Sequence, residues 1–276
     1  MHNAQVPTTI IDLHHGGWVL VAVDAGVRLQ VNMINLMLGD CLERMKEIPD
    51  GSVDMVLADP PYGTTACKWD SVIPFEPMWE QLKRIIKPNG AIVLFGAEPF
   101  SSLLRVSNLK MFKYDWIWIK TKTQHFAQAP YRPMTEHEII SCFSYGGNAK
   151  NATPRMVYNP QGLVKCNKLC KGKKATHSEH RMRLTDQKDY VQEWTGYPTT
   201  ILQFASVGKP LHPTQKPVDL CEYLIKTYTN EGETVLDNCM GSGTVGVACK
   251  NLNRKFIGIE KDETYFKIAQ DRIAAI

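Results

Sequence analysis

Apolar and polar residues alternate from residue 33 onward in blocks that predict alternating strands and helices. Short apolar runs that end at turn residues predict strands at 34–38, 53–58, 91–95, 114–119, 138–143, 234–236 and 255–259. Apolar residues at helical spacing predict helices at 41–48, 75–86, 99–108 and 217–228, then one ending near 252 and one beginning near 264. This order is typical of an α/β fold with helices on both faces of a mostly parallel sheet.

Two segments stand outside this pattern. Residues 1–32 are expected to form an N-terminal extension, in which 18–23 is a candidate short strand. Residues 146–210 have weak periodicity and a mixture of Gly, Pro, Lys and Thr, and 65 residues are too many for a structureless loop in a compact domain. We therefore expect a small irregular subdomain at 146–210, inserted between halves at 33–145 and 211–276.

The charge of the chain is uneven along its length. The whole chain of 276 residues is 43% hydrophobic and 22% charged with a net charge of +4, which excludes a disordered or fibrous protein. Residues 146–210 contain 11 Lys and Arg against 4 Asp and Glu, a local +7, which leaves −3 for the remainder. A basic segment therefore interrupts a slightly acidic protein, and a charge run taken by itself is usually a solvated surface.

No run of about 18 apolar residues predicts a membrane span, and no basic start followed by an apolar run predicts a secretory signal. The expected location is the cytoplasm, where the eight cysteines are expected to be reduced.

A glycine-rich loop follows the strand predicted at 234–236. Asp237 ends this strand, Gly241, Gly243 and Gly246 follow, and Glu260 ends the next strand. Glycines allow a ligand to approach the backbone, and an acid at the next strand end can accept hydrogen bonds from ribose hydroxyls. The same glycine spacing fits a dinucleotide, but a carboxylate at the strand end suits an ammonium group or hydroxyls better than a phosphate. S-adenosylmethionine carries both groups and no phosphate.

A second strand ends in Asp59-Pro60-Pro61-Tyr62. Proline has no amide hydrogen, so backbone carbonyls here are rigid acceptors beside the Asp59 carboxylate. An amino group could donate one hydrogen to Asp59 and one to the Pro60 carbonyl, which would make its nitrogen a better nucleophile. Tyr62 offers a ring on which a base could stack. A plain strand-ending turn is the alternative for this motif taken by itself.

Three motifs in a fixed order resemble one family. Asp59-Pro60-Pro61-Tyr62, His212-Pro-Thr-Gln-Lys-Pro217 and Val235-Leu-Asp-Asn-Cys-Met-Gly-Ser-Gly-Thr244 are similar to those of the S-adenosylmethionine-dependent DNA amino-methyltransferases of the β class. That resemblance implies a circularly permuted, Rossmann-like class I methyltransferase fold, with the insertion as target-recognition region. Asn238-Cys239 depart from the Pro-Phe that the family usually has.

The resemblance also implies residue roles. Asp59 and Pro60, with Pro61, would bind the target amine, and Tyr62 would stack on a flipped base. Cofactor contacts are implied for Asp59 and for Asp40, His212, Thr214, Lys216, Asp237, Gly241, Ser242, Gly243 and Glu260. Among these, Glu260 would bind the ribose hydroxyls, Asp40 would face the adenine, and the His212–Lys216 segment would lie near the methionine carboxylate.

The expected activity is site-specific methylation of adenine N6 in double-stranded DNA. Adenine is favoured because the first motif residue is Asp, where N4-cytosine members often have Ser; cytosine N4 is the alternative base. No Pro-Cys dipeptide occurs, which argues against addition to cytosine C5. An RNA base, a protein amide, a binding module without catalysis and a nicotinamide dehydrogenase are further alternatives. A restriction endonuclease partner and a choice between monomer and homodimer are left open.

Basic and aromatic residues outside these motifs are the candidates for DNA contact. They are Lys165, Lys168, Lys171, Lys173, Lys174, Arg181 and Arg183 in the insertion, and Phe126 and Arg132 in the predicted loop at 121–133. Cys166 and Cys170 with His177 and His180 raise the alternative of a zinc site. Their spacing is not that of common zinc fingers and the surrounding lysines repel a cation, so no metal is expected.

Overall fold

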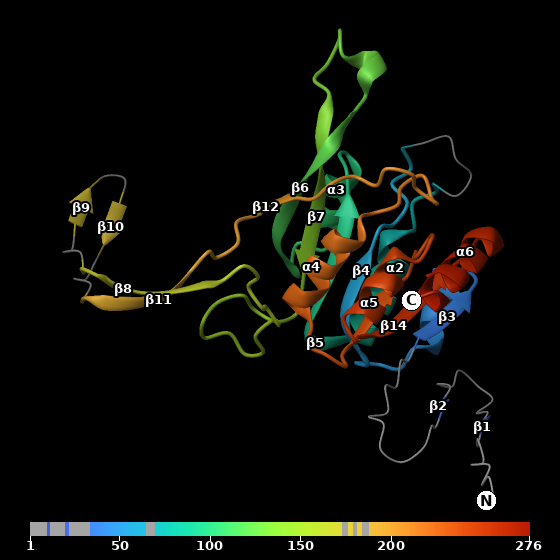
Figure 1. Cartoon of the computed structure of the whole chain (residues 1–276), viewed down its shortest axis with the longest axis horizontal. Coiled ribbons are helices and arrows are strands. Elements are labelled where there is room, and N and C mark those ends of the chain that lie inside the picture. Colours follow the sequence, from blue (N-terminus) through green and yellow to red (C-terminus); the bar gives the residue numbers. More distant parts are fainter. Residues whose placement is uncertain are drawn as a thin grey trace, which may run out of the picture. The chain divides into compact units, whose positions relative to one another are not determined.

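The computed structural model describes residues 10–11, 20–21, 34–64, 70–172, 176–178, 181–183 and 188–276. Its central feature within these ranges is an eight-stranded sheet in the order β12-β6-β7-β5-β4-β13-β14-β3 (Figure 1). The strands are β3 (Ile34–Leu38), β4 (Val53–Ala58), β5 (Ile86–Gly96), β6 (Phe112–Gln124), β7 (Thr135–Phe143), β12 (Ile201–Gln203), β13 (Thr234–Asp237) and β14 (Lys255–Glu260). The sheet confirms the predicted α/β fold.

One strand of this sheet runs against the others. β7 pairs antiparallel with both β5 and β6, whereas the remaining neighbours pair in parallel. The first residues of β7 therefore lie at the edge where the parallel strands end. Ligands bind at that edge in open α/β sheets.

Helices cover both faces of the sheet. α4 (Val218–Tyr228), α5 (Thr244–Asn251) and α6 (Glu263–Ala274) bury their apolar residues against one face. α1 (Cys41–Arg44), the short 3-10 helix η1 (Met45–Glu47), α2 (Phe75–Ile85) and α3 (Phe100–Ser107) cover the other face. β4 is buried along its whole length, because it lies between these two layers in the middle of the sheet.

Several predicted boundaries differ from the structure; the strand expected at 91–95, for example, is β5 and begins at Ile86. The helix expected at 41–48 is α1 followed by η1. β6 continues to Gln124, four residues into the loop expected at 121–133, and β7 begins at Thr135, after that loop. A short 3-10 helix, η2 (Phe126–Gln128), closes this hairpin, which extends beyond the sheet (Figure 1). The outer part of β6 is exposed and polar, so no alternation of apolar residues signalled it.

Residues Pro160–Thr199 form a second compact unit. β8 (Val164–Cys170) pairs antiparallel with β11 (Tyr190–Thr195), and β9 (Thr176–Ser178) pairs antiparallel with β10 (Arg181–Arg183). This unit is shorter than the insertion predicted at 146–210. Residues up to Asn159 and from Thr200 belong to the main unit, where β12 pairs with β6.

The N-terminal segment contributes β1 (Ile10–Ile11) paired antiparallel with β2 (Leu20–Val21). Of the strand expected at 18–23, residues 20–21 are strand and the others lie outside the described residues. No helix in the described part of the chain is long and apolar enough to span a membrane.

Candidate active site

A cavity of about 1100 Å³ lies where the parallel strands end. Asp59 follows β4 and Asp237 ends β13; the two strands are hydrogen-bonded neighbours, with Val235 opposite Met55 and Leu236 opposite Val56. Glu260, at the end of β14, lines the same cavity. The two halves of the chain therefore meet here, as expected for neighbouring strands.

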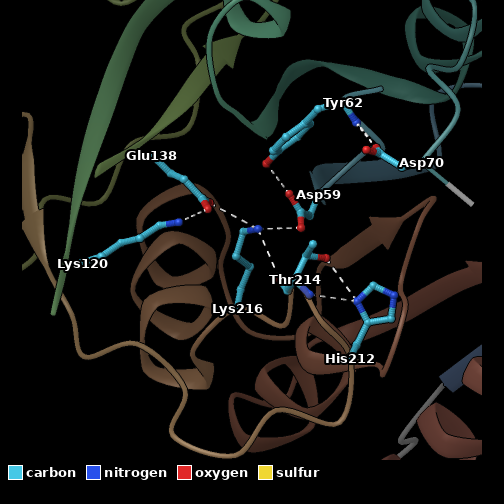
Figure 2. Close-up of polar contacts among 8 residues, drawn as sticks. All are labelled: Asp59, Tyr62, Asp70, Lys120, Glu138, His212, Thr214 and Lys216. Carbon is cyan, nitrogen blue, oxygen red and sulfur yellow. Dashed lines mark hydrogen bonds and ion pairs between the residues drawn. The ribbon is translucent and has the colours of Figure 1, made fainter. Parts of the chain in front are cut away.

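The Asp59 carboxylate is held by two side chains (Figure 2). Its Oδ1 accepts a hydrogen bond of 2.5 Å from the Tyr62 hydroxyl, and its Oδ2 accepts one of 2.5 Å from the Lys216 ammonium. A carboxylate has about four lone-pair sites, so each oxygen can still accept a hydrogen from an amine. Pro60 and Pro61 line the cavity beside it.

Asp70 shapes the loop that follows the prolines. Its Oδ1 accepts the backbone N–H groups of Tyr62 and Gly63 at 2.8 and 2.9 Å, and its Oδ2 accepts that of Thr64 at 2.9 Å. Three bonds to successive amides fix the backbone that carries Tyr62. Sequence reasoning missed this residue; an Asp a few residues after a Pro-Pro turn is a recognisable signal for such an anchor.

The Tyr62 ring packs against Phe100, with ring centroids 5.0 Å apart and an angle of 28° between the planes. Burial raises the pKa of its hydroxyl well above the usual value, and the negative charges of Asp59, Glu138 and Asp70 raise it further. Tyr62 is therefore a hydrogen-bond donor at neutral pH. One face of the ring is covered, so a base would have to stack on the other face.

Lys216 and Glu138 form a buried charged group with Asp59 and Lys120 (Figure 2). The Lys216 ammonium lies 3.2 Å from Glu138 and also contacts the carbonyl of Thr214, while Lys120 donates to the other Glu138 oxygen. Burial by itself would lower the pKa of Lys216, but the carboxylates of Asp59 and Glu138 outweigh it and raise this pKa. Burial likewise opposes the effect of Lys216 and Lys120 on Glu138, whose pKa is nevertheless lowered. Lys216 and Glu138 therefore both stay charged at neutral pH.

Sequence reasoning missed Glu138 and Lys120 and assigned Lys216 to the methionine carboxylate. The Lys216 ammonium bonds to Asp59 in the cavity, and its contact with the methionine carboxylate stays a prediction. Lys120 directly follows the apolar run at 114–119 and Glu138 begins the one at 138–143. A charged residue at each of these places is the signal that could have found the pair, since such residues are rarely fully buried unless paired.

His212 and Thr214 lie against the glycine loop. The Nδ1 of His212 is 3.1 Å from the Thr214 hydroxyl, and its ring packs edge-on against Tyr265 with centroids 4.2 Å apart. A Cβ placed on Gly241 would be 3.6 Å from the His212 ring. Burial lowers the pKa of His212, which favours a neutral imidazole at this position. The motif predicted to reach the cofactor thus lies beside the loop predicted to hold it.

Asp237 is buried and accepts the backbone N–H of Cys239 at 3.0 Å. Burial, together with the charges of Asp59 and Glu260, raises the pKa of Asp237 well above its usual value. The neighbouring Asn238 carboxamide is buried, and its oxygen and nitrogen make no hydrogen bond of good geometry among the described residues. The Cys41 and Cys239 thiols share a hydrogen bond that lowers the pKa of Cys41 and raises that of Cys239. Within the described part of the chain, the end of the cavity next to β13 therefore lacks a positively charged, hydrogen-bonding group to pair with Asp237 and Asn238.

Glu260 organises the glycine loop from the next strand. Its Oε2 accepts the N–H of Gly241 and its Oε1 that of Asp262, both at 2.8 Å. Gly241 and Gly243 have φ of +51° and +75°, a region that favours glycine. A Cβ on Gly243 would also lie 2.9 Å from the Ala269 Cβ, so close packing with α6 requires glycine there.

Ser242 and Asp40 are the last two predicted cofactor residues; Ser242 lies within this loop and Asp40 follows β3. The Ser242 hydroxyl and carbonyl are contacted by Arg272 of α6 at 3.3 and 3.1 Å. Asp40 caps α1 by accepting the N–H of Leu42, and its other oxygen is 3.4 Å from the Lys261 ammonium. Both residues line the cavity, and their contact with a cofactor stays a prediction.

The predicted DNA-contact residues are spread over both units. Phe126 and Tyr131 at the tip of the β6–β7 hairpin are 81% and 89% exposed, Arg132 is exposed beside them, and His125 lines the cavity. Lys165, Lys168 and Lys171 are exposed on the second unit, and Arg181 and Arg183 lie in β10, where only the backbone is described. Lys173, Lys174 and His180 lie outside the described residues.

Comparisons with known proteins agree with this geometry. The family model of the DNA methylases matches residues 53–271. The type II methyltransferase M.HpaI of Haemophilus parainfluenzae is 30% identical over 86% of this chain and 73% of that protein. M2.DpnII of Streptococcus pneumoniae is 28% identical over 88% of this chain and 91% of its own length.

Solved structures show the same fold. The complex of M1.HpyAVI with SAM has a TM-score of 0.57 and 26% identity, covering 87% of this chain and all of that one. The cytosine-N4-specific PvuII DNA methyltransferase has a TM-score of 0.60 at 15% identity, covering 88% of this chain and 90% of that one, which shows the fold alone. With Asp59 and Asp237 at the ends of paired strands of this fold and a family match across both, the chain belongs to the DNA methylase family.

Proposed function

We propose that this protein transfers a methyl group from S-adenosylmethionine to the N6 amino group of an adenine flipped out of double-stranded DNA. The observation that carries the proposal is the pairing of β4 with β13, which places Asp59 and Asp237 at one cavity. A residue suited to an amine and a residue suited to a cationic cofactor thus lie at adjacent strand ends.

The residues at the β13 and β14 ends fit S-adenosylmethionine. Asp237 and Glu260 form no ion pair among the described residues, so an ammonium group and ribose hydroxyls would supply what these carboxylates lack. Asn238 adds an unused donor and acceptor. A pyrophosphate would instead be repelled by two carboxylates, which disfavours the dehydrogenase alternative. When bound, S-adenosylmethionine supplies an electrophilic methyl group on a positively charged sulfur.

The residues at the β4 end would prepare the acceptor nitrogen. Asp59 accepts one hydrogen of the amino group and the Pro60 carbonyl accepts the other, which draws the nitrogen lone pair out of conjugation. Tyr62 and Lys216 hold the Asp59 carboxylate in place, and the Asp70 anchor holds the Tyr62 backbone. Direct attack of nitrogen on a methyl group depends mainly on such alignment, since it needs no covalent enzyme intermediate.

The experiment that tests the function separates the acceptors. The purified protein is incubated with labelled S-adenosylmethionine and pools of duplex DNA, RNA and protein, and the modified base is identified after digestion. We expect label in duplex DNA as N6-methyladenine. N4-methylcytosine would correct the base, and label confined to RNA or protein would overturn the proposal.

Sequencing of methylated bases in the DNA of expressing cells would give the recognition sequence. Because the relatives are named type II methyltransferases, we further propose a short defined site shared with a restriction endonuclease, with action in the cytoplasm. DNA protected by the enzyme should resist a nuclease that cuts at that site.

The β6–β7 hairpin is proposed as a DNA contact of the main unit. It begins at the cavity, which Thr123, Gln124 and His125 line, and ends in exposed aromatic and basic residues. An aromatic side chain can occupy the gap that a flipped base leaves, and an Arg can contact phosphate. The exposed lysines of the second unit are proposed as further phosphate contacts.

Replacing hairpin residues should weaken DNA binding without changing stability, because their side chains are exposed. We expect Phe126→Ala to reduce flipping of a fluorescent 2-aminopurine target, and Arg132→Gln to reduce the salt slope of DNA affinity by about 0.9. The triple variant Lys165→Gln, Lys168→Gln, Lys171→Gln removes up to three phosphate contacts. It should therefore reduce the slope of log affinity against log salt by up to about three times the change expected for Arg132→Gln. Leu109→Ala, another exposed apolar residue, is the control. An unchanged slope in a variant would remove its residues from the DNA surface.

A further inference from the structure

The buried charge cluster, defined as Asp59, Glu138, Lys216 and Lys120, contains two negative and two positive charges, so its net charge is zero. Glu138 reaches it from β7, which runs antiparallel and therefore begins at the edge where β4 ends. Glu138 lines the same cavity as Asp59 and Asp237. The cluster is therefore part of the wall around the reacting groups.

The Lys216 ammonium has three hydrogens and three oxygen neighbours: Asp59 at 2.5 Å, Glu138 at 3.2 Å and the Thr214 carbonyl at 3.3 Å. Without Glu138 the cation would be balanced by Asp59 alone, in the same cavity. Asp59 would then bind Lys216 more strongly and have less capacity for an incoming amine. Lys120 in turn holds the Glu138 carboxylate in place.

We propose that Glu138, held by Lys120, is a positioning residue for methyl transfer: it shares the Lys216 ammonium with Asp59 and keeps the buried charge cluster neutral beside a cationic sulfonium cofactor. This inference rests on the proposed function, because it concerns the same cavity. It assigns no contact between Glu138 and the substrate. The residue acts through Lys216 and through its charge.

The sign of the charge change gives the test. S-adenosylmethionine carries a methyl group and a positive charge on its sulfur, both of which S-adenosylhomocysteine lacks, and the two molecules are otherwise the same. Glu138→Gln leaves one extra positive charge in the wall, so affinity for S-adenosylmethionine should fall roughly tenfold relative to S-adenosylhomocysteine. Lys120→Met leaves one extra negative charge and should shift the affinity ratio in the opposite direction. The double variant should return the ratio toward that of the unmodified protein.

Both ligands are measured by calorimetry, and the single-turnover methylation rate is measured on duplex DNA. We expect Glu138→Gln to slow methyl transfer on the order of 10²-fold while DNA affinity stays unchanged, and Glu138→Asp to restore part of the ratio and rate.

Asp54→Asn is the matched control. Asp54 is a buried carboxylate on β4, bonded to Lys87 at 2.6 Å and to the N–H of Thr234 at 2.9 Å, away from the cavity. The Asp54→Asn variant should lower the melting temperature and leave both the ligand affinity ratio and the methyl-transfer rate unchanged.

Opposite shifts for Glu138→Gln and Lys120→Met support the proposal, because general damage to the fold would not change sign. A wild-type ratio in both, whatever their melting temperatures, overturns it. If Glu138→Gln does not fold, the same affinity ratio measured on Lys120→Met and Glu138→Asp tests the proposal. The affinity ratio of the two ligands is measured without DNA, so it tests this proposal independently of methylation. If the unmodified protein binds both ligands but methylates no DNA, that result refutes the proposed function and not the role of Glu138 in the ratio.

Discussion

Asp59→Ala is expected to lower the methyl-transfer rate by about 10²- to 10³-fold, the scale seen when a positioned electrostatic partner of a reacting group is removed. The variant loses the acceptor for the target amine and leaves the Tyr62 hydroxyl without its partner. Glu138 still neutralises one of the two lysines, so we expect the fold to persist. Binding of duplex DNA should change little.

Single-turnover kinetics with saturating DNA and cofactor measure this effect directly. Asp59→Asn keeps the size of the side chain and should be nearly as slow, because an amide cannot replace the charge. Asp50→Ala serves as control, since this exposed carboxylate lies in the turn before β4 and pairs with Arg84. Normal turnover by either Asp59 variant would contradict the mechanism.

Glu260→Ala is expected to weaken cofactor binding by about tenfold to a hundredfold, the range for losing a hydrogen bond to a charged group. The carboxylate also bonds the N–H groups of Gly241 and Asp262, so its removal loosens the loop that follows β13. S-adenosylmethionine and S-adenosylhomocysteine should both lose affinity, because they share the ribose. This pattern differs from that of Glu138→Gln, which spares the neutral ligand.

Calorimetric titration of both ligands decides the role of Glu260. Glu263→Ala, an exposed acid in the first turn of α6, is the control and should bind both ligands normally. An unchanged affinity for S-adenosylhomocysteine in Glu260→Ala would take Glu260 out of the cofactor site.

The sequence predicted the elements that carry the site with good accuracy where their pattern was strong. The strands at 34–38 and 53–58 match β3 and β4, and the helix at 217–228 differs from α4 by one residue. β4 is buried along its whole length, α4 buries one face and β3 is half-buried, so the requirement to cover apolar residues left a clear pattern in each. The outer part of the β6–β7 hairpin is exposed on both sides and has no such pattern, so the sequence predicts a loop there.

The sequence by itself determined that this chain has an α/β fold, which strands end in Asp59 and Asp237, and that the two belong to DNA methylase motifs. Those features are local, because periodicity, prolines and glycines act within a few residues. Only the tertiary structure decided that Lys216, 157 residues from Asp59 in the chain, bonds to it, and that Glu138 completes the cluster. The physical reason is that strand order and the reversed direction of β7 follow from how the layers pack together, which no local pattern records.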